Sequence, residues 1–439
     1  MTVVTRIAPS PTGEMHIGTI RTALFNYLYA KHFGGTYFVR IEDTDKERNK
    51  PEWVEAIWRD FEWCGLVPDA RYIQSEHLGR HRELLTDLVA SGKAYISKEP
   101  AKDDPSRTVE VVRLRNSGTS VTFDDLIRGS VTFDTTELGD FVIARSVGDP
   151  LYHFAVVVDD HDAGVTHVIR AEEHISNTPR QILIQEALGF PRPVYAHIPL
   201  ILAPDRSKLS KRKHGASIDR YRAQGFLPEA IINYLALLGW NPGTEQELFS
   251  LEELVRLFDM GQVHKAGAMF DIEKLRWFNH EYLMRLSDDQ YFDVITTFCA
   301  ATEPLPSYTR ALVPVLKERF HTLAEVVDAV RGDEYDYLDV VPTLAPERIP
   351  DKKSDAAAAV RHLSHARDIL SAQHDFDAAS LKNALWDYAT EEGRGSVLWP
   401  LRYALSGKDK SPDPFTIASI LGKEHTLDRI TRALASLAT

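Results

Sequence analysis

The chain has 439 residues, too many for a single hydrophobic core, so we expect about two to four domains. Its hydrophobic content of 44% and charged content of 26% are ordinary for a globular protein, and no apolar run reaches the roughly 18 residues that span a membrane. The formal net charge of −13 argues against a protein that is basic throughout, so contact with nucleic acid would require a local basic surface.

The first part of the chain alternates predicted strands with predicted helices. In order, the expected elements are strand 2–8, helix 17–33, strand 37–41, helix 52–64 and helix 76–91. Pro51 stands at the start of the second helix, and a glycine follows the end of each helix, as helix boundaries favour. This order predicts an α/β fold with a parallel sheet that helices cover on both sides.

The strand pattern at 2–8 leaves no room for a signal peptide at the N-terminus. The chain has 2 cysteines, Cys64 and Cys299, which stand far apart in the sequence. They argue against a disulfide framework and a Cys-rich zinc site, and they suit a reducing compartment. We therefore expect a cytoplasmic protein with no membrane partner.

The pattern changes after residue 97. Residues 98–107 are polar and contain proline, so they predict a loop. Short strands expected at 109–114, 120–123, 130–133 and 141–146 indicate a mainly antiparallel insertion. The apolar run 154–158 predicts a buried parallel strand. The elements expected next are strand 166–171, helix 176–188 and an extended segment 194–202.

Helices dominate from residue 228 onward. The helical spacing covers residues 228–238, 251–258, 288–300, 308–320, 354–371, 378–390, 414–421 and 426–437. No strand is expected after about residue 285.

A first motif, Pro9 to Thr19, lies where the first strand turns into the first helix. Its prolines and Gly13 force a tight loop, which puts His16 and Gly18 at the first turn of the helix. The N–H groups and the positive potential of a helix N-terminus attract phosphates, and Gly18 lets a nucleotide approach the backbone. Alone, this motif fits a surface histidine in a Pro-rich turn at least as well.

A second motif, Lys208-Leu209-Ser210-Lys211-Arg212, changes that balance. It lies in a stretch, 205–222, that has 7 basic and 2 acidic residues. A solvated loop would explain an ordinary charge run. Attack of a carboxylate on an α-phosphate crowds negative charge onto phosphorus and pyrophosphate, and lysines suit the stabilisation of that state. The two motifs together predict an ATP site that forms an adenylate.

With these motifs in order, the chain resembles the class I aminoacyl-tRNA synthetases, and within them the bacterial-type glutamyl-tRNA synthetases. The resemblance covers roughly residues 1–285. Its matching segments are 6–13, 16–19, 40–45, 157–161, 168–174, 208–212, 227–230, 233–235, 270–271 and 274–275. The helical remainder fits the anticodon-binding part of the family in type and length.

The resemblance implies a Rossmann-type parallel-sheet catalytic domain with an inserted α+β acceptor-binding domain and an all-α C-terminal anticodon-binding region. The expected division is catalytic domain, first half, 1–90; insertion, 91–145; catalytic domain, second half, 146–240; stem-contact region, 241–285; and helical region, 286–439, with a split near 350. It also implies a reaction in which glutamate and ATP give glutamyl adenylate, and the glutamyl group then passes to the 3′ end of tRNA.

The resemblance also assigns the site residues. For glutamate, Arg6 and Tyr152 would hold the side-chain carboxylate and Arg170 the α-carboxylate. Glu42 would take the ammonium group, and the backbone near Ala8 and Ser10 would close the pocket. For ATP, Glu173 would contact the ribose or adenine, and the remaining expected residues are Thr12, His16, Gly18, Lys208, Ser210 and Lys211, of which His16, Gly18, Lys208 and Lys211 are the expected catalytic residues. Arginine forks suit carboxylates, which makes these roles chemically reasonable.

The sequence departs from the family at three places. Thr19 stands where many class I enzymes have a second histidine, and Val156 where some relatives have an asparagine near the glutamate side chain. Some bacterial members carry a Cys-ligated zinc just after the position of Tyr95, but Ile96-Ser97-Lys98 follows here, so no structural zinc is expected. Asp159 to Asp162 looks like a metal cluster, yet we favour a structural or ribose-side role. Magnesium would arrive with ATP.

The expected partners are L-glutamate, ATP and tRNA(Glu), with tRNA(Gln) as an open alternative, and a monomer is the default. The sequence leaves open whether tRNA must bind before glutamate is activated. The rival functions are a glutaminyl-tRNA synthetase, a short paralogue that glutamylates a modified tRNA base, a silent RNA-binding relative and a small-molecule adenylyltransferase. The helical C-terminus, the chain length and the lysines of the second motif argue against them.

Overall fold

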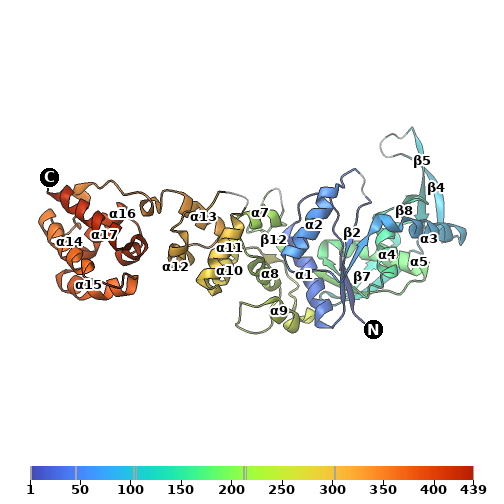
Figure 1. Cartoon of the computed structure of the whole chain (residues 1–439). Helices are drawn as coiled ribbons and strands as arrows, with labels where there is room; N and C mark the ends of the chain where they lie inside the picture. Colours follow the sequence, from blue (N-terminus) through green and yellow to red (C-terminus); the bar gives the residue numbers. More distant parts are fainter. Residues whose placement is uncertain are drawn as a thin grey trace. The chain divides into compact units, whose positions relative to one another are not determined.

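Figure 1 shows the computed structural model of the chain, which describes residues 2–44, 47–101, 104, 106–210, 213, 215–300 and 303–438. The chain forms two compact units, Met1–Phe278 and Asn279–Thr439, and the division falls inside helix α10 (Ile272–Arg285). In the described part of the chain, no helix is both long and apolar enough to pass through a membrane.

Parallel strands form the centre of the first unit. β1 (Val4–Ile7), β2 (Thr36–Ile41) and β3 (Ala70–Ile73) pair in parallel in that order, and β10 (His167–Ala171) pairs in parallel with β11 (Val194–Ile198). Three hydrogen bonds between Val4 and Thr166 (2.8, 3.0 and 3.3 Å) join the first strand set to the second. The predicted parallel sheet is confirmed, although the sequence did not indicate β3.

Helices pack around these strands (Figure 1). They are α1 (Ile17–His32), α2 (Pro51–Trp63), α3 (Leu78–Ala90), α5 (Thr178–Leu188), α7 (Ile218–Ala223), α8 (Pro228–Leu237) and α9 (Leu251–Leu257). Most of their ends lie within a few residues of the predicted ones, because proline and glycine mark them in the sequence.

One predicted strand is wrong. Residues 154–158 belong to helix α4 (Tyr152–Asp162), in which every residue from Phe154 to Asp160 is buried. A helix enclosed on all sides has no polar face, so its apolar run has the same appearance in the sequence as a buried strand. The correction matters because a helix places Tyr152, Val156 and Asp160 on one face, four residues apart.

The insertion divides between two sheets. β4 (Ala94–Pro100), β5 (Thr108–Leu114), β8 (Val142–Ser146) and β9 (Asp149–Pro150) form an antiparallel sheet. The hairpin of β6 (Ser120–Asp125) and β7 (Gly129–Asp134) instead extends the β10–β11 sheet, through a parallel pairing of β6 with β11. The predicted loop at 98–107 is partly wrong, since β4 continues to Pro100.

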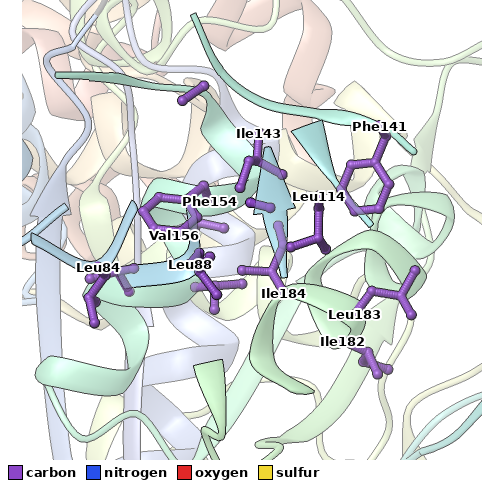
Figure 2. Packing of buried hydrophobic residues seen from close by; sticks show 14 of the residues in the cluster. Leu84, Leu88, Leu114, Phe141, Ile143, Phe154, Val156, Ile182, Leu183 and Ile184 are labelled. Atoms are coloured by element: carbon purple, nitrogen blue, oxygen red, sulfur yellow. The ribbon is translucent and has the colours of Figure 1, made fainter. Parts of the chain in front are cut away.

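A hydrophobic cluster connects the insertion to the central sheet and its helices. Leu84 and Leu88 of α3, Phe154 of α4, Ile184 of α5 and Ile143 of β8 pack together, as Figure 2 shows. All five are less than 9% exposed. Because α4 contributes to this core, packing on several sides fixes the orientation of the helix.

A short pair of strands and a set of helices complete the chain. β12 (Ile201–Leu202) pairs in parallel with β13 (Ala268–Met269). The second unit contains α11 (Asp288–Phe298), α12 (Thr309–Arg319), α13 (Leu323–Arg331), α14 (Ala356–Ser371), α15 (Ala378–Glu392), α16 (Arg394–Ser406) and α17 (Pro414–Leu437). Among the described residues, no strand follows β13, as predicted.

The sequence missed α7, α10, α13 and α16, and it divided α17 into two helices. The division coincides with a kink at Gly422. The expected domain boundaries near 90, 145, 240, 285 and 350 remain predictions.

Gly35 allows β1 and β2 to approach each other at the end of α1. A Cβ atom at this position would lie 2.1 Å from the carbonyl oxygen of Val3, and that oxygen accepts a hydrogen bond of 2.8 Å from the N–H of Thr36. Because a backbone atom cannot move aside cheaply, we expect Gly35→Ala to lower the free energy of unfolding by about 1–3 kcal/mol. Urea denaturation followed by circular dichroism measures this change.

Gly79→Ala is the matched control for this prediction. Gly79 lies in helix α3, and nothing stands within 4 Å of the position that its Cβ would take. Alanine should therefore raise the stability there by about 0.5–1 kcal/mol. A Gly35→Ala protein as stable as the wild type would contradict the close approach.

Candidate active site

A cleft of about 620 Å³ opens at the carboxyl ends of β1, β2, β10 and β11. Ligand sites in open α/β sheets form at this edge. The predicted residues that line it are Arg6, Ala8, Ser10, His16, Gly18, Glu42, Tyr152, Arg170, Glu173, Lys208 and Ser210. Thr12 is exposed and does not line the cleft, and Lys211 lies outside the described residues.

The two motifs meet across this cleft although almost two hundred residues separate them. His16 and Ser217 form an antiparallel bridge, in which the Ile17 N–H donates to the Ala216 carbonyl (3.1 Å) and the Ile218 N–H donates to the Met15 carbonyl (3.0 Å). Residues 216–218, which follow the second motif in the sequence, are thus attached to the start of α1. The predicted meeting of the two motifs in one pocket is confirmed.

His16 and Gly18 depend on each other locally. His16 is the N-cap of α1, where its Nδ1 accepts a hydrogen bond of 2.9 Å from the Gly18 N–H. A Cβ at Gly18 would lie 2.9 Å from that same nitrogen, so the histidine ring itself requires glycine at this position. Since Nδ1 acts as the acceptor, the neutral ring carries its proton on Nε2, the donor that a phosphate oxygen requires.

Lys208 forms an ion pair with Glu173, and both residues line the cleft. The lysine stands in the loop after β12, and the glutamate follows β10. Both side chains are substantially exposed, at 57% and 42%. The pair brings two residues of the predicted ATP site together, and an incoming triphosphate would compete with Glu173 for the ammonium group.

Arg6 and Glu42, two residues predicted to bind glutamate, line the cleft and are linked through Asp160 and Arg40, which do not line it. Asp160 accepts hydrogen bonds from Nε and Nη2 of Arg6 (3.0 and 3.1 Å) and from Nη1 of Arg40 (2.5 Å), while Nη2 of Arg40 donates to Glu42 (3.0 Å). Burial favours a neutral Asp160, but the two guanidinium groups outweigh it and hold the pKa of its carboxyl below the usual value. Burial raises the pKa of Glu42, against the effect of Arg40.

Arg170 is buried and held by a relay of side chains. Its Nε donates to Nε2 of His197 (3.1 Å) and its Nη2 to the hydroxyl of Thr178 (2.9 Å). Because Nε2 of His197 accepts, Nδ1 carries the proton and donates to Asp125 (2.6 Å), which belongs to the β6–β7 hairpin. The insertion therefore contributes directly to the orientation of an arginine in the cleft.

Comparison with known families agrees with this geometry. The family described as "tRNA synthetases class I (E and Q), catalytic domain" matches residues 2–108 and 99–277, and the family described as "Anticodon binding domain" matches residues 272–434. A glutamate–tRNA ligase from Moorella thermoacetica is 39% identical to this chain, over 98% of this chain and 97% of that protein. One from Oleidesulfovibrio alaskensis is 38% identical, over 99% of each.

The chain belongs to the glutamate–tRNA ligase family of class I aminoacyl-tRNA synthetases. Solved structures support the same membership. A glutamate tRNA ligase from Elizabethkingia meningosepticum, crystallised in complex with its amino acid, has a TM-score of 0.87 and 30% identity, with 100% of each chain covered. The glutamate–tRNA synthetase of Elizabethkingia anophelis has a TM-score of 0.85 and 31% identity, with 99% of this chain and 100% of that chain covered. Glutamate, ATP and tRNA are the substrates that membership of the ligases implies.

In this glutamate–tRNA ligase fold, the acidic segment from Asp159 to Asp162 has a structural part. Asp159 is buried and accepts hydrogen bonds from Gln74 (2.6 Å) and Tyr72 (3.0 Å), and it lies 2.6 Å from Nε2 of His81. Among the described residues, no group of three or more His, Cys, Asp and Glu side chains is arranged to hold a metal ion. These contacts support the structural interpretation of the segment. The expected absence of zinc remains a prediction.

Sequence reasoning missed the residues that support the ligase site from behind. Arg40 and Asp160 stand inside recognised motifs, but Arg40 was assigned no role, and Asp160 only the structural or ribose-side role given to its whole segment. For Asp125 and His197 the sequence offers no local signal, because they lie 72 residues apart and meet only through the β6–β11 pairing. Arg40 and Asp160 could have been found, because each is a charged residue that follows an apolar run in the sequence.

His174 lines the cleft and provides a prediction on pH. Burial, reinforced by Arg170, lowers its pKa to about 4, whereas the unfolded chain has the ordinary value of 6.5. As the pH falls from 6.5 toward 4, the unfolded chain takes up a proton that the folded protein does not, so stability present above pH 6.5 is lost in this window. We expect His174→Gln to melt with a smaller loss of Tm between about pH 7 and pH 5 than the wild type.

Differential scanning fluorimetry across that pH range measures the effect. His264→Gln, at an exposed histidine that does not line the cleft, is the control and should follow the wild-type curve. An identical pH dependence for His174→Gln and the wild type would contradict the role of this half-buried ring.

Proposed function

We propose that this chain joins L-glutamate to tRNA(Glu) in two steps within this one cleft. In the first, an oxygen of the α-carboxylate attacks the α-phosphorus of ATP, the bond to the β-phosphate breaks, and pyrophosphate leaves. In the second, the terminal hydroxyl of the tRNA attacks the glutamyl carbonyl carbon and AMP leaves. The observation that carries this proposal is a continuous cleft with arginines and a glutamate at one end and His16, Gly18 and Lys208 at the other.

At the amino-acid end, the proposed roles follow from charge and hydrogen-bond geometry. Asp160 engages Nε and Nη2 of Arg6, so the edge of the guanidinium that carries Nη1 remains to fork the side-chain carboxylate. The hydroxyl of Tyr152, which also lines the cleft, would bind the same carboxylate. Arg170 would take the α-carboxylate and Glu42 the ammonium. Ala8 and Ser10 would contribute backbone contacts, as the first strand ends there.

At the nucleotide end, the proposed ligand is ATP with Mg²⁺. The proton-bearing Nε2 of His16 and the N-terminus of α1 suit the phosphates, and Gly18 keeps the backbone accessible. Lys208 and Lys211 would neutralise the charge that develops on phosphorus and pyrophosphate. Glu173, released from Lys208, would then contact the ribose or adenine, and Ser210 would add a contact from the same loop. Thr12 is the weakest of the proposed contacts because it lies outside the cleft.

For tRNA, we propose that residues 91–145 contact the acceptor stem and the helical second unit reads the anticodon, in a monomer that works in the cytoplasm. Lys208 and Ser210 line the cleft in which the 3′ end of the tRNA would meet the adenylate. Acceptance of tRNA(Gln) beside tRNA(Glu) depends on contacts in the helical unit, and the charging assay below decides it.

The test is the charging of purified tRNA(Glu) and tRNA(Gln) with radiolabelled glutamate, run side by side, together with ATP–pyrophosphate exchange with and without tRNA. We expect glutamyl-tRNA(Glu) to form, and aspartate and glutamine to be poor substrates. Absence of glutamate charging on either tRNA, by a protein that still binds ATP, would overturn the proposed function.

A further inference from the structure

We propose that the buried pair Arg40–Asp160 is a positioning element that sets the spacing between the two ends of the amino-acid site, and that it thereby selects glutamate over the shorter aspartate. This inference rests on the proposed function, because it concerns how Arg6 and Glu42 receive one substrate. Neither Arg40 nor Asp160 lines the cleft, so both act through the residues that do.

The contacts form one uninterrupted chain. Arg6 is joined to Asp160 by two hydrogen bonds, Asp160 to Arg40 by one, and Arg40 to Glu42 by one, with all donor–acceptor distances between 2.5 and 3.1 Å. The residue proposed for the side-chain carboxylate is thus connected to the residue proposed for the ammonium by two side chains alone. A shift of Asp160 or Arg40 would therefore change the distance between Arg6 and Glu42.

The chain of contacts is buried along its whole length. The side chain of Arg40 is 0% exposed, that of Arg6 is 5%, and those of Asp160 and Glu42 are 11%. The two guanidinium groups and the two carboxylates alternate in sign, which compensates charges that would be costly to bury alone. Because movement of any one group would leave a buried charge unpaired, the network holds its four side chains in one arrangement.

The fold explains why these four residues meet. In the parallel pairing of β1 with β2, Arg6 lies opposite Phe38, so Arg40, two residues further along β2, points to the same face as Arg6. Glu42 follows two residues later, just past the strand end, where its N–H donates to the Pro9 carbonyl (3.0 Å). Helix α4 then brings Asp160 between the two arginines (Figure 1 shows α4 and β2).

The same face of α4 reaches the cleft. Tyr152 and Val156 line it, and Asp160 stands one turn further along the helix. Because Val156 also packs in the hydrophobic cluster shown in Figure 2, the helix cannot slide without disturbing that core. The spacing is therefore anchored to the packed interior of the catalytic unit rather than to a loop.

The test measures ATP–pyrophosphate exchange in the presence of tRNA, for glutamate and aspartate, on the full chain with Asp160→Asn. Asparagine keeps the shape but loses the charge that holds both arginines. We expect the KM for glutamate to rise about tenfold or more, the ratio of kcat/KM for glutamate over aspartate to fall by a similar factor, and the KM for ATP to stay near the wild-type value. A purely electrostatic role predicts the opposite, because removal of a negative charge near the site should tighten glutamate.

Two further variants keep the test decisive. Asp160→Glu preserves the charge and moves the carboxylate by one methylene group, so it too should lower the ratio for glutamate over aspartate, even if Asp160→Asn does not fold. Asp159→Asn removes the charge of the neighbouring, fully buried carboxylate on α4, which bonds to Gln74 and Tyr72 and stands 3.9 Å from Nε of Arg40. It should reduce the melting temperature with little change in that ratio.

The possible results distinguish a failure of the proposed function from a failure of the positioning role of Arg40 and Asp160. A wild-type protein that activates neither amino acid would overturn the proposed function and this inference with it. A wild type that activates glutamate, with either Asp160 variant retaining the wild-type ratio, would overturn the inference alone. An equal fall in the ratio for Asp159→Asn and Asp160→Asn would do the same, because it would show a general loss of structure.

Discussion

Lys208→Ala is expected to slow the formation of glutamyl adenylate by about 10²–10³-fold, while the KM for glutamate stays close to that of the wild type. Lys208 lines the nucleotide end of the cleft and is held by Glu173 rather than by any residue of the amino-acid end. Its ammonium can therefore follow the charge that develops on the leaving pyrophosphate. An interaction made mainly in the transition state lowers kcat and kcat/KM together. Single-turnover assays of adenylate formation measure the rate, and its dependence on the glutamate concentration measures the effect on glutamate binding.

Lys50→Ala is the matched control for Lys208→Ala. Lys50 is also an exposed lysine paired with a glutamate, Glu52 (3.4 Å), but it does not line the cleft. It should leave the rate of adenylate formation unchanged. Wild-type turnover by Lys208→Ala would show that this lysine takes no part in the mechanism. A rise in the KM for glutamate with an unchanged kcat would show that Lys208 binds glutamate and does not act on the phosphates of ATP.

The elements that could be predicted are those that local chemistry marks. Prolines and glycines delimit α1, α2, α3 and α8, and the polar residues that follow β1, β2 and β10 collect at one edge of a parallel sheet, so the contents of the cleft could be anticipated. The meeting of His16 with the loop after β12 could be anticipated only because two chemically complementary motifs required it.

What could not be predicted depends on tertiary packing. The run from Phe154 to Val158 has no polar face because α4 is buried on all sides, so its period could not show in the sequence. Pairing of β6 with β11, which places Asp125 against His197, depends on a single register position far along the chain. The positioning role that we infer for Asp160 has the same origin, since only the fold brings a residue of α4 into contact with the arginine side chains of β1 and β2.

Arg6→Ala is expected to lower kcat/KM for glutamate by about 10²-fold or more and to leave the KM for ATP near the wild-type value. Arg6 is buried, and Asp160 fixes its guanidinium by two hydrogen bonds. Loss of this group would leave the substrate carboxylate without its fork and would leave Asp160 with one arginine in place of two. Removal of one partner from a buried charge pair commonly costs about 2–5 kcal/mol. Steady-state exchange kinetics with each substrate varied in turn provide the measurement.

Two further variants serve as controls for Arg6→Ala. Arg6→Lys keeps the charge but cannot form the planar fork, so its loss for glutamate should lie between those of the wild type and the alanine variant. Arg71→Ala, on β3 over the ring of Trp58 and outside the cleft, should leave both substrates unaffected. Equal losses for glutamate and ATP in Arg6→Ala would contradict the assigned role, because a residue seated at the amino-acid end should affect the two substrates differently. A full recovery by lysine would show that charge alone, without the fork, is what glutamate requires.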